Sequence, residues 1–178
     1  MKKLSRKSRV GIIILTVLLS LAAGAWALWQ AINYYLVWDM SIRGFNRYTK
    51  DFQVMADIIL EHEDEINQQE YPWLHSGSSG LPSNDAYIKI QNGAYLPLTD
   101  IEKEHVKKAN EAYHAATDHD MDGIALKENE IWFGSEGRGY CVVYTKDGKR
   151  PDYSKYTSKN REVSIRKYSS HWYGIMTD

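Results

Sequence analysis

The chain has 178 residues, enough for one domain with its own core and an accessory segment, and its 43% apolar and 25% charged residues are typical of a folded protein. Five of the 22 basic residues lie in the first nine positions, so the remainder carries 17 basic against 23 acidic residues, a net charge of −6. Because nucleic-acid binders are commonly cationic, this balance argues against that class. The single cysteine, Cys141, excludes an intramolecular disulfide and a Cys-x-x-Cys motif.

The amino-terminal segment predicts a membrane anchor. Residues 10–29 contain no charged side chain, and a helix of this length spans about 30 Å, the thickness of a bilayer's hydrocarbon core. Basic residues precede it and none follows until Arg43, so the positive-inside rule predicts a cytoplasmic tail (1–9), a transmembrane helix (10–32) and an extracytoplasmic remainder. Aromatic residues mark the outer membrane boundary: Trp26, Trp29, Tyr34, Tyr35 and Trp38.

A cleaved signal peptide is the alternative. Residues 25–27 (Ala-Trp-Ala) satisfy the small-x-small rule of a cleavage site. Retention is favoured because no helix breaker follows the apolar run, and because an aromatic belt has no purpose in a peptide that is removed.

An amphipathic helix is predicted over residues 33–68. Apolar and aromatic residues there recur at alternating spacings of three and four, which places them on one helical face: Phe45, Tyr48, Phe52, Met55, Ile59, His62 and Ile66. We expect this stripe to lie along the domain's own sheet. A homodimer through residues 45–66 is the alternative, although only about three heptads are present and no complementary charges flank them.

Residues 69–178 predict a small extracytoplasmic α+β domain. Residues 71–85 are rich in proline, glycine and serine and predict a loop, and residues 86–92 predict a short strand. Thr99 and Glu102 form a capping box, which predicts one helix over residues 100–117. We expect that helix to bury Ile101, Val106, Ala109, Ala112, Tyr113 and Ala116.

The residues after 122 predict an antiparallel β-meander. They are rich in aromatic and β-branched residues, and turn residues occur at Asn129, at 137–139 and at Asp147-Gly148. Pro151 and the polar run to Asn160 predict a longer connection before the last pair of strands.

Two stretches in this part carry a resemblance. The sequences EIWFGSEGRGYCVVYTKDGKRP (130–151) and HWYGI (171–175) resemble a pattern of small membrane-anchored or secreted proteins of Gram-positive bacteria, which are mostly uncharacterised. In these a hairpin carries Tyr-x-x-Asp-Gly-Lys and a late Trp-Tyr closes the domain. The resemblance covers residues 99–176 and implies a bacterial cell-envelope location and a fold type, but no catalytic residue.

The segment Asp118-His-Asp-Met-Asp-Gly123 matches the start of a calcium loop. Asp118, Asp120, Asp122 and Gly123 would occupy positions 1, 3, 5 and 6. However, Asn129 replaces the bidentate glutamate of position 12, and the residues beyond predict a strand rather than a second helix. We therefore expect a helix-ending turn, with weak calcium binding by the three aspartates as the alternative.

Evidence for other chemistry is thin. His114, Asp118 and His119 offer part of a zinc site, but the ligand set is incomplete and no HExxH spacing occurs. Cys141 lies in a predicted strand and is expected to pack as a small hydrophobic residue. The sequence predicts that the protein is not an enzyme; a calcium- or zinc-dependent module or enzyme that uses the Asp118–Asp122 loop is the alternative.

The carboxy-terminal third is basic. From Glu136 to Asp178 there are nine basic and five acidic residues. A solvated strand face is the favoured explanation, and an anionic cell-wall polymer or an acidic protein partner is the alternative. Eight of the nine basic residues are interleaved with tyrosines: Lys146, Lys149, Arg150, Lys155, Lys159, Arg161, Arg166 and Lys167.

We thus predict an integral, single-pass protein of the cell membrane, with a non-enzymatic extracytoplasmic binding domain.

Overall fold

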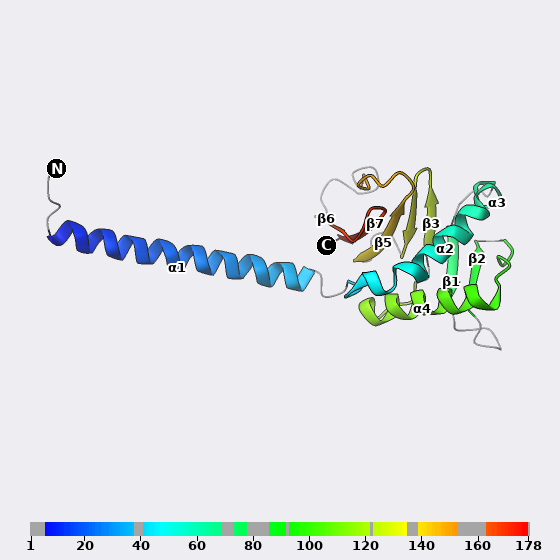
Figure 1. Cartoon of the computed structure of the whole chain (residues 1–178), viewed down its shortest axis with the longest axis horizontal. Helices are drawn as coiled ribbons and strands as arrows, with labels where there is room; N and C mark the ends of the chain where they lie inside the picture. Colours follow the sequence, from blue (N-terminus) through cyan, green and yellow to red (C-terminus); the bar gives the residue numbers. More distant parts are fainter. Residues whose placement is uncertain are drawn as a thin grey trace. The chain divides into compact units, whose positions relative to one another are not determined.

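The computed structural model of the chain describes residues 6–37, 41–68, 73–77, 86–91, 93–121, 123–134, 139–152 and 163–177. The chain divides into two compact units, Met1–Asp39 and Met40–Asp178. The first contains one long helix, α1 (Arg6–Val37), and the second contains all other helices and strands described (Figure 1). The second unit, here called the domain, therefore includes residues 41–68, which the sequence assigned to a separate amphipathic helix.

The helix α1 carries the apolar surface predicted for residues 10–32. Its segment Ile14–Ile32 has 19 residues, a mean hydropathy of 1.6 and no buried side chain. By length and composition this helix can cross a membrane, and a signal sequence near the amino terminus would share both properties.

The helix predicted over residues 33–68 is interrupted. α1 ends at Val37, and Gly44 adopts a left-handed conformation (φ 66°), which a continuous helix does not tolerate. A short 3-10 helix, η1 (Phe45–Arg47), then leads into α2 (Thr49–Glu61) and α3 (Glu63–Asn67).

The apolar stripe is nevertheless confirmed as a packing face. Five of its members are almost completely buried within the domain: Phe45, Phe52, Met55, Ile59 and Ile66. They pack against the domain's own sheet, as the edge-to-face contact between the Phe52 and Phe133 rings shows (centroids 5.5 Å apart). The alternative of a homodimer through residues 45–66 thereby loses the apolar surface on which it depended.

In the described part of the chain the strands form one antiparallel sheet of seven, in the order β2-β1-β3-β4-β5-β7-β6, and the α+β class is confirmed. The helices α2 and α4 (Asp100–Thr117) lie side by side over one face of it, here called the inner face (Figure 1). The strands are β1 (Trp73–Gly77), β2 (Tyr87–Ile90), β3 (Ile124–Lys127), β4 (Glu130–Phe133), β5 (Tyr140–Thr145), β6 (Val163–Lys167) and β7 (Trp172–Thr177).

Three local predictions about the strands are corrected. Residues 73–77 form β1 rather than a loop, because β1 pairs with β2 on one side and β3 on the other. The meander runs only from β3 to β5. Asp147-Gly148 follows β5 without forming a hairpin to β6, because β5 pairs with β4 and β7. Of the predicted turn at 137–139, residues 137 and 138 lie outside the described part of the chain.

The predicted helix over residues 100–117 is confirmed as α4, together with its capping box. The Thr99 hydroxyl accepts a hydrogen bond from the Glu102 backbone N–H, and the Glu102 carboxylate accepts one from the Thr99 N–H at 2.7 Å. Ile101 was wrongly predicted to be buried: it is 73% exposed, whereas Tyr113 further along is buried.

Aromatic side chains fill the space between the sheet and the helices. The rings of Phe45, Phe52, Phe133 and Trp172 contact one another, with Phe52 and Phe133 meeting edge to face. Two glycines leave room for tyrosine side chains, Gly134 directly after β4 and Gly174 in β7. A Cβ on Gly134 would collide with the Tyr113 hydroxyl, and one on Gly174 would lie 2.5 Å from the Tyr168 hydroxyl oxygen.

The tyrosine hydroxyls beneath the helices have protein partners. Tyr113 donates to the Tyr140 carbonyl at 2.7 Å, and the hydroxyls of Tyr140 and Tyr168 share a hydrogen bond of 2.8 Å. Burial of Tyr140, reinforced by the neighbouring Tyr168, raises the pKa of its hydroxyl well above the ordinary value. This part of the core therefore contains buried polar hydroxyls, and each of them has a hydrogen-bond partner.

Candidate functional site

The acidic turn after α4 is a helix cap followed directly by a strand. Asp118 is the C-cap of α4, has a left-handed conformation (φ 58°) and donates its N–H to the His114 carbonyl at 2.8 Å. β3 follows at Ile124, and the Gly134 N–H donates to the Gly123 carbonyl at 2.8 Å. The sequence prediction of helix, turn and strand is thus confirmed, and this context differs from the helix that follows a calcium loop in an EF-hand.

The structure brings together only part of the predicted metal ligands. The Asp120 carboxylate lies 3.2 Å from His114 Nδ1, and both side chains are mostly exposed. His119 and Asp118 are also exposed, and Asp122 lies outside the described residues. Among the residues that the structure describes, no group of three His, Cys, Asp or Glu side chains is arranged to hold a metal ion. Metal binding by Asp118, Asp120 and Asp122 stays a prediction.

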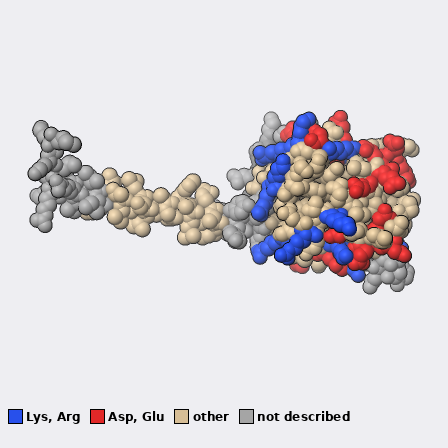
Figure 2. Space-filling view, in the orientation of Figure 1, with Lys and Arg blue, Asp and Glu red and all other residues tan. Residues whose placement is uncertain are grey.

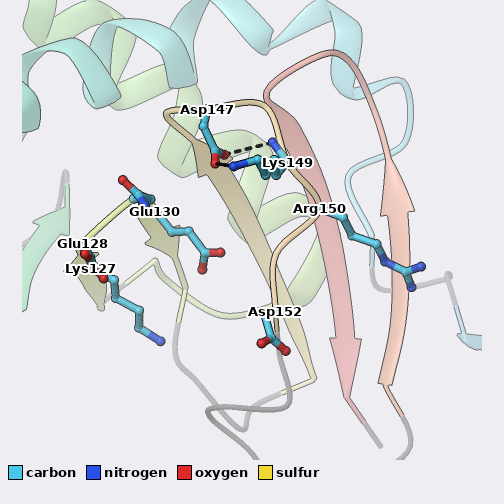
Figure 3. A pocket seen from close by; sticks show the side chains of 8 residues that line it. Lys127, Glu128, Glu130, Asp147, Lys149, Arg150 and Asp152 are labelled. Carbon is cyan, nitrogen blue, oxygen red and sulfur yellow. Dashed lines mark hydrogen bonds and ion pairs between the residues drawn. The ribbon is translucent and has the colours of Figure 1, made fainter.

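A shallow polar hollow of about 200 Å³ lies between the β3–β4 turn and the segment that follows β5 (Figure 3). Its lining combines four acidic and three basic side chains with one amide. Sequence reasoning named Lys149 and Arg150 as candidate partner-binding residues, but it named none of the acidic lining residues in that role. The two segments are about twenty residues apart in the chain, so no sequence pattern indicates that they meet. The lining residues are Lys127, Glu128, Asn129, Glu130, Asp147, Lys149, Arg150 and Asp152.

Hydrogen bonds hold the two sides of the hollow together. The Lys146 N–H donates to the Asn129 carbonyl at 2.9 Å, which ties the end of β5 to the β3–β4 turn. Asp147 accepts from the Lys149 N–H at 3.0 Å and contacts the Lys149 ammonium at 3.0 Å. These hydrogen bonds lower the pKa of the Asp147 carboxyl, which is therefore ionised at neutral pH.

A buried tryptophan organises the other side of the hollow. The Lys127 ammonium lies 4.2 Å from the centre of the Trp132 ring, and the Trp132 indole N–H donates to Glu130 at 2.8 Å. Figure 3 shows the charged ends of Lys127, Glu130 and Asp152 on the same side of the strands, while Arg150 extends away from them. The hollow can therefore offer both signs of charge to a polar partner.

The basic residues of the carboxy-terminal third are partly neutralised within the domain. Lys146 contacts both carboxylate oxygens of Glu63, at 2.6 and 2.8 Å. Lys149 is paired with Asp147, and the Lys167 ammonium lies 5.6 Å from the centre of the Tyr173 ring. Lys155, Lys159 and Arg161 lie outside the described residues.

The residues that carry the Gram-positive resemblance meet in the sheet. Tyr144 is opposite Trp172 in the β5–β7 register, and the Tyr173 hydroxyl donates to the Gly148 carbonyl at 2.9 Å. Cys141 is buried in the same apolar cluster as Tyr173, as predicted for a packing residue. The pattern thus consists of turn and core residues. No protein-family model, curated protein or solved structure matches the chain.

Proposed function

We propose that the protein is a single-pass membrane protein whose extracytoplasmic domain binds a partner without catalysing a reaction. The distribution of exposed apolar side chains carries the proposal. Of the twelve large hydrophobic residues that are exposed in the described part of the chain, ten lie on α1, and the other two are Tyr95 and Ile101. An apolar surface of this length needs lipid around it, whereas the domain buries its own core.

Charge supports a cytoplasmic amino terminus. Five basic residues precede the apolar span within the first nine positions, and three follow it within the next twenty: Arg43, Arg47 and Lys50. The larger number marks the cytoplasmic side, because basic residues near a span resist translocation.

The hollow beside Trp132 is the contact surface that we assign to the partner. Its nearly balanced charges, four acidic and three basic, suit the mixed polar surface of a protein better than an anionic cell-wall polymer. The carboxy-terminal basic residues that sequence reasoning linked to such a polymer include Lys146 and Lys149, both of which have carboxylate partners within the domain.

Anchoring is tested on the full chain expressed in a Gram-positive bacterium. The protein should resist carbonate extraction, and its intact mass should include residues 1–29. In whole cells a membrane-impermeant amine reagent should label Lys149, whose side chain is 83% exposed, and not Lys3. A mature chain that begins at Leu28, or labelling of Lys3 alone, would contradict the proposal.

Binding is tested with a photo-crosslinking amino acid in the same cells. Glu128 and Glu111 are both exposed, the first at the hollow and the second on α4. We expect crosslinks to a discrete protein partner from position 128 and none from position 111. The same products from both positions, or none from either, would remove the hollow as the contact surface.

A further inference from the structure

Basic side chains gather at one end of the domain. Figure 2 shows Lys and Arg concentrated toward one end in that view, and Asp and Glu toward the other. Four exposed residues, Arg43, Arg47, Lys50 and Arg166, form what we call the basic patch. The patch is local, since residues 10–178 together carry a net charge of −6.

Core contacts bring these four residues together from two distant parts of the chain. The ring of Phe45, which lies between Arg43 and Arg47, stacks on Tyr168 with centroids 4.6 Å apart. Tyr168 in turn lies against Gly174, the residue that pairs with Arg166 in the β6–β7 register. The Arg47 side chain folds back over Gly44, with Nε 3.8 Å from where a Cβ would be.

The helix dipoles explain only part of this distribution of charge. Acidic residues lie in the first turns of both helices, Asp51 in α2 and Glu63, Asp64 and Glu65 in α3, which is the order that a helix dipole favours. Residues 41–50, however, contain three basic residues and no acidic one, and Arg47 lies two residues before α2, where the dipole disfavours a positive charge. A partner outside the domain accounts for these basic residues better than helix stability does.

We propose that the basic patch binds the anionic phospholipid headgroups of the membrane that α1 crosses. This inference rests on the proposed function, because it needs α1 in the bilayer. Arg43 follows Val37 by only six residues along the chain, so a bilayer is the polyanionic surface always within reach. Arginine and lysine bind phosphate through charge-assisted hydrogen bonds, and the acidic end of the domain is repelled by the same surface.

The test compares the full chain in nanodiscs of phosphatidylcholine alone and in nanodiscs with about one third phosphatidylglycerol. The measurement is the rate at which an amine reagent acetylates Lys50, relative to Lys149 as an internal control, by mass spectrometry. Attraction to an anionic surface raises the fraction of time that a basic residue spends there about five-fold. We therefore expect Lys50 to react several-fold more slowly in the anionic discs. At 1 M salt the Debye length is about 3 Å, and the protection should disappear.

Variants and a competitor separate the remaining outcomes. The double change Arg43→Glu and Arg47→Glu should abolish the protection of Lys50, whereas Lys107→Glu and Lys108→Glu, an equal change in charge on α4, should leave it intact. An unchanged ratio of Lys50 to Lys149 in the two discs overturns the inference. Equal protection by soluble polyphosphate in neutral discs also overturns it, in favour of a polymer site. Failure of the chain to enter nanodiscs contradicts the proposed function instead.

Discussion

The two faces of the sheet are both buried, but they use their polar groups differently. On the inner face the hydroxyls of Tyr113, Tyr140 and Tyr168 bond to backbone or to each other beneath α2 and α4. On the outer face, Trp132 and Tyr173 lie under lysine side chains that reach the surface. The polar groups of the inner face are therefore satisfied within the domain and contribute to its stability. Those of the outer face are covered by charged side chains that a partner can contact. Three predictions test this difference, and two further ones concern the two ends of α4.

The largest effect is expected at Gly174 on the inner face. A Cβ there would lie 2.5 Å from the Tyr168 hydroxyl oxygen and 2.8 Å from ring carbons, so Gly174→Ala must displace Tyr168 from its stack on Phe45. We expect the free energy of unfolding to fall by about 3 kcal/mol, measured by denaturant titration.

A double-mutant cycle gives the control for Gly174. In the background Tyr168→Ala the clash is removed, and Gly174→Ala should then cost much less than it does in the wild type. Equal costs in both backgrounds would show that the two residues do not determine each other's position.

The second effect concerns the helices that cover the inner face. His105 Nδ1 of α4 lies 2.7 Å from the Asp51 carboxylate of α2, and both side chains are at most 15% exposed. Asp51→Ala leaves the imidazole without this partner, and we expect a loss of about 2 kcal/mol, because a polar group in a nearly buried site is costly to leave unsatisfied. Asp51→Ala combined with His105→Ala should cost less than the sum of the single changes, measured by thermal unfolding.

The outer face should respond more weakly. Lys127→Ala removes the ammonium above Trp132, and we expect a loss of about 0.5–1 kcal/mol together with a red shift of tryptophan emission as the ring becomes hydrated. Lys127→Arg should retain most of both properties. A loss of stability as large as that of Gly174→Ala would show that the outer face contributes as much to stability as the inner face, contrary to the difference described above.

Local patterns in the sequence predicted the elements that depend on local interactions. The stripe through Phe52 and the capping box at Thr99 each need only a few neighbouring residues, and both occur as predicted. β1 was missed because its stability comes from distant partners: Leu74 pairs with Ile90 and with Ile124. The residues around β1 are rich in proline, glycine and serine, and the loop over residues 71–85 was predicted from that composition.

Long-range pairing also limited the prediction of the candidate site. Asp147-Gly148 has the chemistry of a hairpin turn, but Tyr144 pairs with Trp172, so the chain must leave β5 and return by another strand. The hollow exists only because that departing segment passes the β3–β4 turn, where Glu130 lies. The charges of the hollow could therefore not be placed together from the sequence, because the order of the strands in the sheet was not known.

A smaller effect is expected at the capping box of α4. Hydrogen bonds from the Thr99 hydroxyl and backbone lower the pKa of Glu102, so the ionised carboxylate stabilises the folded state above its ordinary pKa. This contribution is lost as the pH falls through the lowered pKa. Glu102 is well hydrated, and Glu102→Ala should therefore cost only about 0.5 kcal/mol at pH 7. The difference from the wild type, measured by urea unfolding, should shrink as the pH falls below the ordinary pKa of a glutamate.

The smallest effect is expected from calcium at the acidic turn. The Asp120 carboxylate already contacts His114 at 3.2 Å, and the Asp118 backbone is fixed as the cap of α4. A calcium ion would have to replace the first contact and would find no bidentate glutamate, since Asn129 stands at position 12 and lies in the β3–β4 turn. Millimolar calcium should therefore leave the midpoint of thermal unfolding unchanged, both in the wild type and in Asp120→Ala. A rise in the wild type that Asp120→Ala abolishes would instead assign the turn to metal binding. The domain would then have a second ligand site, which would lie at the end of α4 rather than at the hollow beside the β3–β4 turn.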